Sequence, residues 1–233
     1  MRGGVAYDQR VTLIDLHTHT RPLSHDSFLS ADELIEAAKA NGLDGICLTE
    51  HDFFWEQEAA AELARRHDFV VIAGIEVNTE FGHTLVFGLE QFVFGMHRLA
   101  DLVRLVATAG GAMVGAHPYR RQLPFELRDA GDWSGALEQT LRNESYRHAH
   151  AIETYNGRGT ERQNEFSRQV CERLGLAATA GSDSHESGDV GRCATEFSAR
   201  IDGLGDLIEE LRAGRCRPVV LREAAPSPFR RLD

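Results

Sequence analysis

The sequence predicts an α/β fold in which parallel strands alternate with helices and close into a barrel. Short apolar runs alternate with helical patterns along most of the 233 residues, an order typical of βα units that build a parallel sheet. Histidines and carboxylates follow nearly every apolar run. A barrel collects such residues from many strands at one face, whereas an open sheet uses only a few strand ends at its switch point. The placement of the polar residues therefore favours a barrel.

Strands are expected where a short apolar run lies between turn residues. Residues 76–79 can also pair locally with the strand that follows them. In chain order, the expected strands are 11–16, 43–49, 69–74, 83–88, 112–116, 151–155, 177–181 and 217–221.

Helices are expected where apolar residues recur at helical spacing and cap residues mark the ends. Ser30 and Glu33 form a capping box that opens the first helix, and Asn41-Gly42 ends it. The expected helices are 31–40, 56–67, 97–109, 135–144, 160–174 and 204–213. The rest of the stretch 118–150 is polar and irregular.

The length suits a single domain over residues 1–233. Its motif-bearing core covers about 11–191, and the polar tail over 224–233 is expected to be loose. Hydrophobic residues make up 42% of the chain, which can fill a sizeable core, and no segment approaches the ~20 apolar residues of a membrane span. The N-terminus lacks the apolar stretch of a signal peptide, so we expect a cytoplasmic protein without a membrane partner.

The formal net charge of −11 argues against long nucleic acid and anionic membranes as partners. A small phosphorylated substrate is compatible with this charge, because bound divalent ions add local positive charge. The four cysteines stand far apart and form no CxxC pair. We therefore expect reduced structural thiols.

Two pairs of residues with the same spacing predict metal ligands at opposite ends of the chain. His17 and His19 stand two apart where the first strand ends, so in a continuing strand both side chains point to one face and can hold one metal. Asp183 and His185 repeat this spacing after another strand, and Gly181 before them allows close packing.

Further candidate ligands follow the strands between these pairs. His51 ends one apolar run, and His117 precedes Pro118, which restricts the turn. Glu76 follows an apolar strand, where a carboxylate is costly unless it is paired or bound to a metal, so it is our candidate to bridge two metals. His83 opens a strand and reaches the site if the segment 76–83 folds back as a hairpin.

Arginines close to these histidines are candidates for binding phosphate. Arg120 and Arg121 follow His117, and Arg21 follows His19. The alternative is a solvated charge at each of these positions. The sequence holds no serine elbow, P-loop or GxGxxG motif, so serine nucleophiles and nucleotide-dependent redox chemistry have no support.

Together the motifs resemble those of the PHP (polymerase and histidinol phosphatase) family of metal-dependent phosphoesterases, from about Val11 to Gly191. The resemblance implies a single-domain distorted (β/α)7 barrel, TIM-like, with two to three divalent ions that are zinc, manganese or iron. The motifs that carry it are His17-x-His19, Thr49-x-His51-Asp52, Ala116-His117-Pro118 and Gly181-Ser182-Asp183-Ser184-His185. The ligands that it implies are His17, His19, His51, Glu76, His83, His117, Asp183 and His185.

Two positions depart from the usual family pattern. Many members carry a Ser-Asp-Gly step after the first motif, whose aspartate is a ligand, whereas this chain has Ser24-His25-Asp26. Some members have a histidine at the spacing of His25, so we expect His25 to be the ligand, with Asp26 as the alternative. Glu50 stands where many members have aspartate. We expect this difference to affect the groups that surround the metal ligands and not the ligands themselves.

The expected function is that of a phosphoesterase that hydrolyses a small phosphate ester through a metal-activated hydroxide. The ester is a phosphomonoester or the end of a nucleotide or oligonucleotide. We expect catalytic roles for Glu76, Asp183 and His185, and phosphate binding by Arg120 and Arg21. Two alternatives stay open: a metal-dependent hydrolase of C–N or C–O bonds, and a non-catalytic binding module stabilised by metal.

Overall fold

The computed structural model describes residues 11–123 and 130–222. Its strands, in chain order, are β1 (Thr12–Thr18), β2 (Gly45–Leu48), β3 (Val70–Ala73), β4 (Ile75–Thr79), β5 (Gly82–Phe87), β6 (Ala112–Gly115), β7 (Ala151–Asn156), β8 (Ala177–Gly181), β9 (Cys193–Phe197) and β10 (Cys216–Val220). Its helices are α1 (Ala31–Ala40), α2 (Gln57–His67), α3 (Leu99–Ala109), α4 (Ala130–Thr140), the short 3₁₀ helix η1 (Glu144–Arg147), α5 (Glu161–Leu174) and α6 (Leu204–Ala213).

The strands form two sheets of five. One sheet has the order β10-β9-β1-β2-β3 and the other β4-β5-β6-β7-β8. Strand pairing is parallel within β1-β2-β3 and within β6-β7-β8, but β4, β5 and β6 pair antiparallel, as do β1, β9 and β10. The predicted parallel order therefore holds for most strands, and β5 and β9 run opposite to the other strands of their sheets.

Isolated β-bridges join the two sheets near the carboxyl ends of β1 and β2. His51 bridges to Glu76, and Thr18 bridges to Ser184. The amide of Asp183 also donates to the carbonyl oxygen of His17, at 2.8 Å. These contacts bring together strand ends from both sheets. The pairing describes two sheets rather than one closed sheet, so the (β/α)7 barrel stays a prediction.

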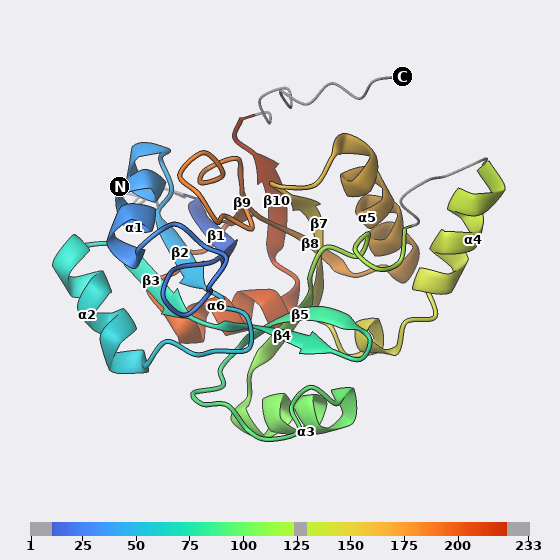
Figure 1. Ribbon diagram of the computed structural model, residues 1–233, viewed down its shortest axis with the longest axis horizontal. Helices are drawn as coiled ribbons and strands as arrows, with labels where there is room; N and C mark the ends of the chain where they lie inside the picture. Colours follow the sequence, from blue (N-terminus) through green and yellow to red (C-terminus); the bar gives the residue numbers. More distant parts are fainter. Residues whose placement is uncertain (1–10, 124–129, 223–233) are drawn as a thin grey trace, which may run out of the picture.

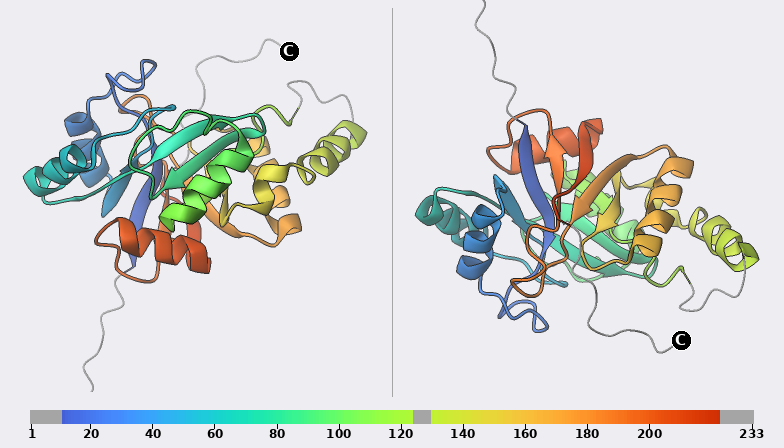
Figure 2. Two further views of the ribbon diagram at one scale, coloured as in Figure 1. Left: turned by 90° about the horizontal axis from the view of Figure 1, so that it is seen from below. Right: turned by 90° about the horizontal axis from the view of Figure 1, so that it is seen from above.

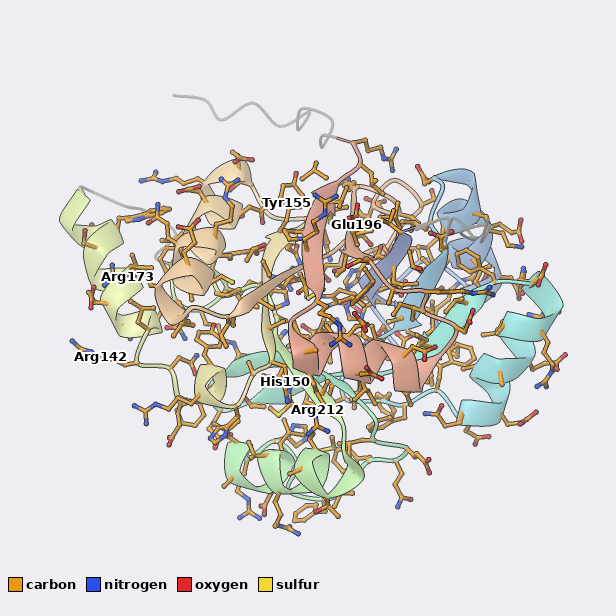
Figure 3. The ribbon with its side chains drawn as sticks, turned by 180° about the vertical axis from the view of Figure 1, so that it is seen from behind. Arg142, His150, Tyr155, Arg173, Glu196 and Arg212 are labelled. Atoms are coloured by element: carbon orange, nitrogen blue, oxygen red, sulfur yellow. The ribbon has the colours of Figure 1, made fainter. Side chains whose placement is uncertain are left out.

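The helices surround the strands on several sides (Figure 1). α1 and α2 lie on one side, α4 and α5 on the opposite side, and α3 lies below the β4–β5 hairpin. The views from below and above show α4 as the outermost helix on its side, next to α5 (Figure 2). A guanidinium of Arg212, on α6, donates to the carbonyl oxygen of Gly110 at 3.1 Å and so ties α6 to the end of α3 (Figure 3).

The main apolar core lies between the sheets. Ile14 and Leu16 of β1 meet Leu85 and Phe87 of β5 and Phe197 of β9, all of them buried. Smaller clusters lie under α1 and α2, under α3, and between α4 and α5. Because both sheets bury one face in this core, the polar side chains that follow the strands are held on a rigid support.

Most expected elements are present within a residue or two of their predicted ends. The first helix has the predicted capping box, with both hydrogen bonds formed between Ser30 and Glu33. The helix expected at 135–144 differs in the structure. Helix α4 begins earlier, at Ala130, and ends at Thr140, and the short 3₁₀ helix η1 follows from Glu144. Among the described residues, no helix is long and apolar enough to cross a membrane. The single domain over 1–233 stays a prediction, and its tail over 224–233 lies outside the described residues.

Strand β9 has no counterpart among the expected strands. Cys193, Ala194 and Phe197 are buried, and β9 pairs antiparallel with both β1 and β10. The pairings between distant segments make Cys193–Phe197 a strand. The sequence of these five residues alone does not reveal such pairings. The four cysteines are free, as expected, and the thiol of Cys193 is buried away from solvent.

Candidate metal centre

The structure gathers the expected histidine ligands at the carboxyl ends of the strands. The imidazole of His19 lies 4.1 Å from that of His51 and 4.5 Å from that of His185, measured between ring centroids. His117 lies 5.4 Å from His17 and 5.2 Å from His83 in the same measure. His83 reaches the cluster because β4 and β5 form the predicted hairpin, in which it pairs with Asn78. So many imidazoles at such spacing are typical of a multinuclear metal site.

One group of donor atoms surrounds a single point. Nε2 of His19 lies 3.3 Å from Oδ1 of Asp183 and 3.6 Å from Oε2 of Glu76. Nε2 of His17 lies 3.7 Å from the same Oδ1 and 3.5 Å from Oε1 of Glu76. Ligands at zinc distances of about 2.0–2.2 Å stand roughly 3.3 Å apart in a tetrahedral site, so these separations suit a shared ion.

Four of these donor atoms are buried without a hydrogen-bond partner in the described part of the chain. They are Nε2 of His17, Nε2 of His19, Oε2 of Glu76 and Oδ1 of Asp183. Nδ1 of His51 lies 2.7 Å from Oε2 of Glu76 and forms an ion pair with it when the ring is protonated. Buried polar atoms without partners are costly, and a cation at their common focus would satisfy all of them. The donor set therefore fits a divalent metal.

Glu76 also faces a second group of donors. Its Oε1 lies 2.7 Å from Nδ1 of His83 and 2.9 Å from Nε2 of His117. Because its carboxylate contacts both groups, Glu76 is placed where a bridging ligand would stand. A third group comprises His19, His51 and His185.

Chain segments turn sharply at the expected ligands or next to them. The backbone φ angles of Asp52, His117 and Asp183 are 55°, 26° and 53°, in the left-handed region that side chains disfavour. Each such residue costs about 1–3 kcal/mol, and such strain concentrates at functional sites.

The comparison with known families agrees with this geometry. The family model described as "PHP domain" matches residues 15–154, more than half of the chain. The chain belongs to the PHP domain family. A second model, "PHP-associated", matches residues 161–216 of this PHP protein. No curated protein matches it.

Solved structures share the fold of this PHP protein. A two-domain protein from Bacteroides vulgatus, described as containing a predicted PHP-like metal-dependent phosphoesterase, has 21% identity and a TM-score of 0.63, over 91% of this chain and 66% of that one. An amidohydrolase from Chromobacterium violaceum, with bound sulfate and no metal, has 19% identity and a TM-score of 0.58, over 91% and 99%. The lesion-specific endonuclease PfuEndoQ from Pyrococcus furiosus has 14% identity and a TM-score of 0.56, over 90% and 58%.

At these identities the likeness shows the fold alone. This PHP chain also spans only about two thirds of the first of those proteins. The activities named for the three proteins differ, so they do not choose a substrate for this one.

The charges within the site of this PHP protein depend on one another. Burial alone would lower the pKa of His17, but the carboxylates of Glu153, Asp183 and Glu76 outweigh it and raise that pKa well above its usual value. Burial would raise the pKa values of Glu76 and Asp183, but the neighbouring His17 holds both well below their usual range. Burial, helped by the charge on His17, lowers the pKa of His19 to about 3.

Glu153 is a site residue that the sequence analysis passed over. It is buried on β7, its Oε1 lies 2.9 Å from Nδ1 of His17, and its Oε2 accepts a hydrogen bond from the amide of His117 at 2.9 Å. It thereby orients His17 so that Nε2 faces the carboxylates of Glu76 and Asp183. The signal was present, because an anionic residue inside an apolar strand is costly unless it is paired. The same signal singled out Glu76.

The structure separates the neighbours His25 and Asp26. Both side chains are exposed, but Oδ2 of Asp26 lies 3.2 Å from Nε2 of His185 and 3.4 Å from Nε2 of His51. Asp26, the alternative at this position, is thus the one placed beside the third group of donors.

The predicted phosphate-binding arginines are also separated. Arg120 donates through Nη2 to Oδ2 of Asp183, and its Nη1 lies 3.4 Å from Nε2 of His117. The side chain of Arg21 instead contacts the first turn of α1, where its Nη2 lies 3.2 Å from Oε2 of Glu33. Arg158, which the sequence analysis did not single out, has Nη1 2.9 Å from Nδ1 of His185.

Proposed function

We propose that this PHP protein is a metal-dependent phosphoesterase that hydrolyses a small phosphate ester. The observation that carries the proposal is the set of four buried donor atoms that face one point without hydrogen-bond partners among the described residues. Such a set is poorly stable as an apolar core, because each atom is buried and lacks a hydrogen-bond partner among the described residues.

Three groups of residues would hold the ions. The first is His17, His19, Asp183 and Glu76, the second is Glu76, His83 and His117, and the third is His19, His51, His185 and Asp26. Imidazole with carboxylate suits zinc, manganese or iron. Bound ions of this kind supply a hydroxide nucleophile at neutral pH and offset the charge of the phosphate.

The side chains around the ligands would bind and orient the ester. Arg120 contacts Asp183 and Arg158 contacts His185, so the two guanidiniums border the same pair of ligands. Guanidinium groups form strong paired hydrogen bonds with phosphate oxygens. Asp183 or His185 would accept a proton or protonate the leaving group. We keep Arg120 as the first residue for substrate phosphate.

A small substrate fits the charge of the chain better than long nucleic acid does, because a net charge of −11 repels a polyanion. A hydrolase of C–N or C–O bonds is the second candidate, since one similar structure is named an amidohydrolase. A carbonyl substrate carries no phosphate charge, so this candidate does not need Arg120.

Hydrolysis of matched chromogenic esters tests the proposal. The protein, loaded separately with zinc, manganese or iron, would be assayed on p-nitrophenyl phosphate, its bis ester and p-nitrophenyl acetate, with the metal content of each sample measured. His17→Ala should abolish turnover. Arg120→Met should lower kcat/KM for the phosphate ester roughly 10- to 100-fold, the value of a charged hydrogen bond of about 1.5–3 kcal/mol. Arg173→Met, a surface change on α5, is the matched control.

The outcomes separate the candidates. Turnover of the acetate that survives Arg120→Met would favour the carbonyl hydrolase. A protein that holds its metals and turns over none of these esters would favour the non-catalytic module. Metal-dependent cleavage of an oligonucleotide, with none of the small esters, would overturn the choice of substrate.

A further inference from the structure

Glu50 is a buried carboxylate that none of the proposed metal positions uses. It follows β2 and has no exposed surface. It accepts hydrogen bonds from the amide of Thr20 at 2.8 Å, from Nε1 of Trp55 at 2.9 Å and from Oγ of Ser24 at 2.5 Å, and also from the hydroxyl of Thr20. An ionised carboxylate has about four lone-pair sites, so these donors saturate it.

The hydroxyl of Ser24 links Glu50 to the metal ligands. Its single proton is used in the hydrogen bond to Glu50. Its oxygen also lies 3.3 Å from Nδ1 of His19 and 3.3 Å from the amide nitrogen of His51. Since a hydroxyl has only one proton to give, Ser24 must accept in both of these contacts. Nδ1 of His19 therefore carries the ring proton.

This tautomer decides which nitrogen of His19 is free. With the proton on Nδ1, the lone pair of the neutral ring lies on Nε2. Nε2 is the buried atom that lacks a hydrogen-bond partner in the described chain and lies 3.3 Å from Oδ1 of Asp183. The ring is therefore turned with its metal-binding nitrogen toward the other donors.

We propose that Glu50 and Ser24 are positioning residues that form a hydrogen-bond relay to His19 and select Nε2 as its metal-binding nitrogen. The inference rests on the metal-binding part of the proposed function. Ser24 also belongs to the loop that carries Asp26, and its amide donates to the carbonyl oxygen of Thr20 at 2.8 Å. The relay thus holds the ring and the start of this loop against the same carboxylate.

Two variants break the relay at different places. Ser24→Ala removes the acceptor of the His19 proton, and Glu50→Gln replaces the acceptor of the Ser24 proton with a group that also donates. The control is Ser167→Ala in α5, because Ser167 is buried to a similar extent and, among the described residues, its hydroxyl donates only to the carbonyl oxygen of Gln163 in its own helix. It makes the same chemical change without touching His19.

The first readout is the tautomer of His19 in the metal-free protein. Nitrogen-15 spectra of histidine-labelled protein, assigned with a His19→Gln spectrum, should show the proton on Nδ1 in the unaltered chain and in Ser167→Ala. Ser24→Ala and Glu50→Gln should shift His19 toward a mixture of tautomers. The second readout is zinc affinity by chelator competition, which both variants should weaken about 10- to 100-fold, as expected when the outer partner of a metal ligand is lost.

Three results would decide against the relay. They are a proton on Nε2 in the unaltered chain, an unchanged His19 tautomer in Ser24→Ala, and a zinc affinity in Ser24→Ala equal to that of the Ser167→Ala control. Neither readout measures ester hydrolysis, so failure of the relay is distinguishable from failure of the proposed phosphoesterase. If the unaltered chain binds no zinc, the metal site fails while the tautomer still tests the relay.

Discussion

Gly181 stands where the backbone leaves no room for a side chain. A Cβ added there would lie 2.4 Å from Cβ of His17 and 2.9 Å from Oε1 of Glu153. Close packing at this position was predicted from the sequence alone. The neighbours that demand it are the candidate ligand His17 in β1 and Glu153 in β7.

We expect Gly181→Ala to disturb the metal site as well as stability. Overpacking of this kind costs about 1–3 kcal/mol, and the displaced ring of His17 should bind metal more weakly. Chemical denaturation and metal analysis would measure the two effects. Gly188→Ala is the control, because a Cβ there meets open space. Equal metal content in both variants would contradict the placement of His17.

The adjacent residues His25 and Asp26 give a second test at this scale. Asp26→Asn should lower metal content by about one ion per chain, because an amide is a poorer ligand than a carboxylate for such ions. His25→Ala should leave the content unchanged, since Asp26, rather than His25, contacts His51 and His185 in the described structure. Elemental analysis of both variants decides between them. Loss of metal in His25→Ala would restore the expectation made from the sequence.

Among the elements, α1 and α5 begin with the same kind of cap. Ser30 with Glu33 opens α1, and Thr160 with Gln163 opens α5, each with both hydrogen bonds of a capping box. These ends were predictable because a capping box is formed by residues three positions apart in the chain. Strand β9 was not predictable in this way. It forms by pairing with β1, which is distant in sequence, and with β10, which follows it only after helix α6.

We expect Ser30→Ala to lower the free energy of unfolding by about 1 kcal/mol, within the 0.5–2 kcal/mol typical of lost caps. Thr160→Ala should have an effect of the same order. Urea denaturation of the two variants would measure both. Neither cap contacts the metal ligands, so metal content should stay unchanged; a loss of metal in Ser30→Ala would show that α1 supports the site more directly.

Across the whole molecule, metal binding should be linked to stability and to pH. The raised pKa of His17 means that, without metal, its contribution to stability is present below its ordinary value of 6.5 and is lost as pH rises through the raised value. Metal binding at Nε2 competes with this proton. Zinc should therefore stabilise the protein more at about pH 8 than at about pH 6, with release of protons.

Thermal unfolding with zinc or with a chelator at the two pH values would test this linkage. At zinc about 100 times above Kd, the gain is about 2.7 kcal/mol. Calorimetry in two buffers of different ionisation enthalpy would count the released protons. Glu153→Gln should reduce that count, because it removes a carboxylate that raises the pKa of His17. A gain in Tm that is independent of pH would argue against a proton on His17.

The sequence by itself determined the kinds of donors and the strand ends that carry them, because motifs such as His17-x-His19 and the turn at His117 are local. The tertiary structure decided which groups meet. Glu153 and His17 are 136 positions apart and lie in hydrogen-bond contact at 2.9 Å, and Asp26 rather than His25 lies beside His185. Such choices depend on how distant segments pack, and no pattern within one segment records that packing.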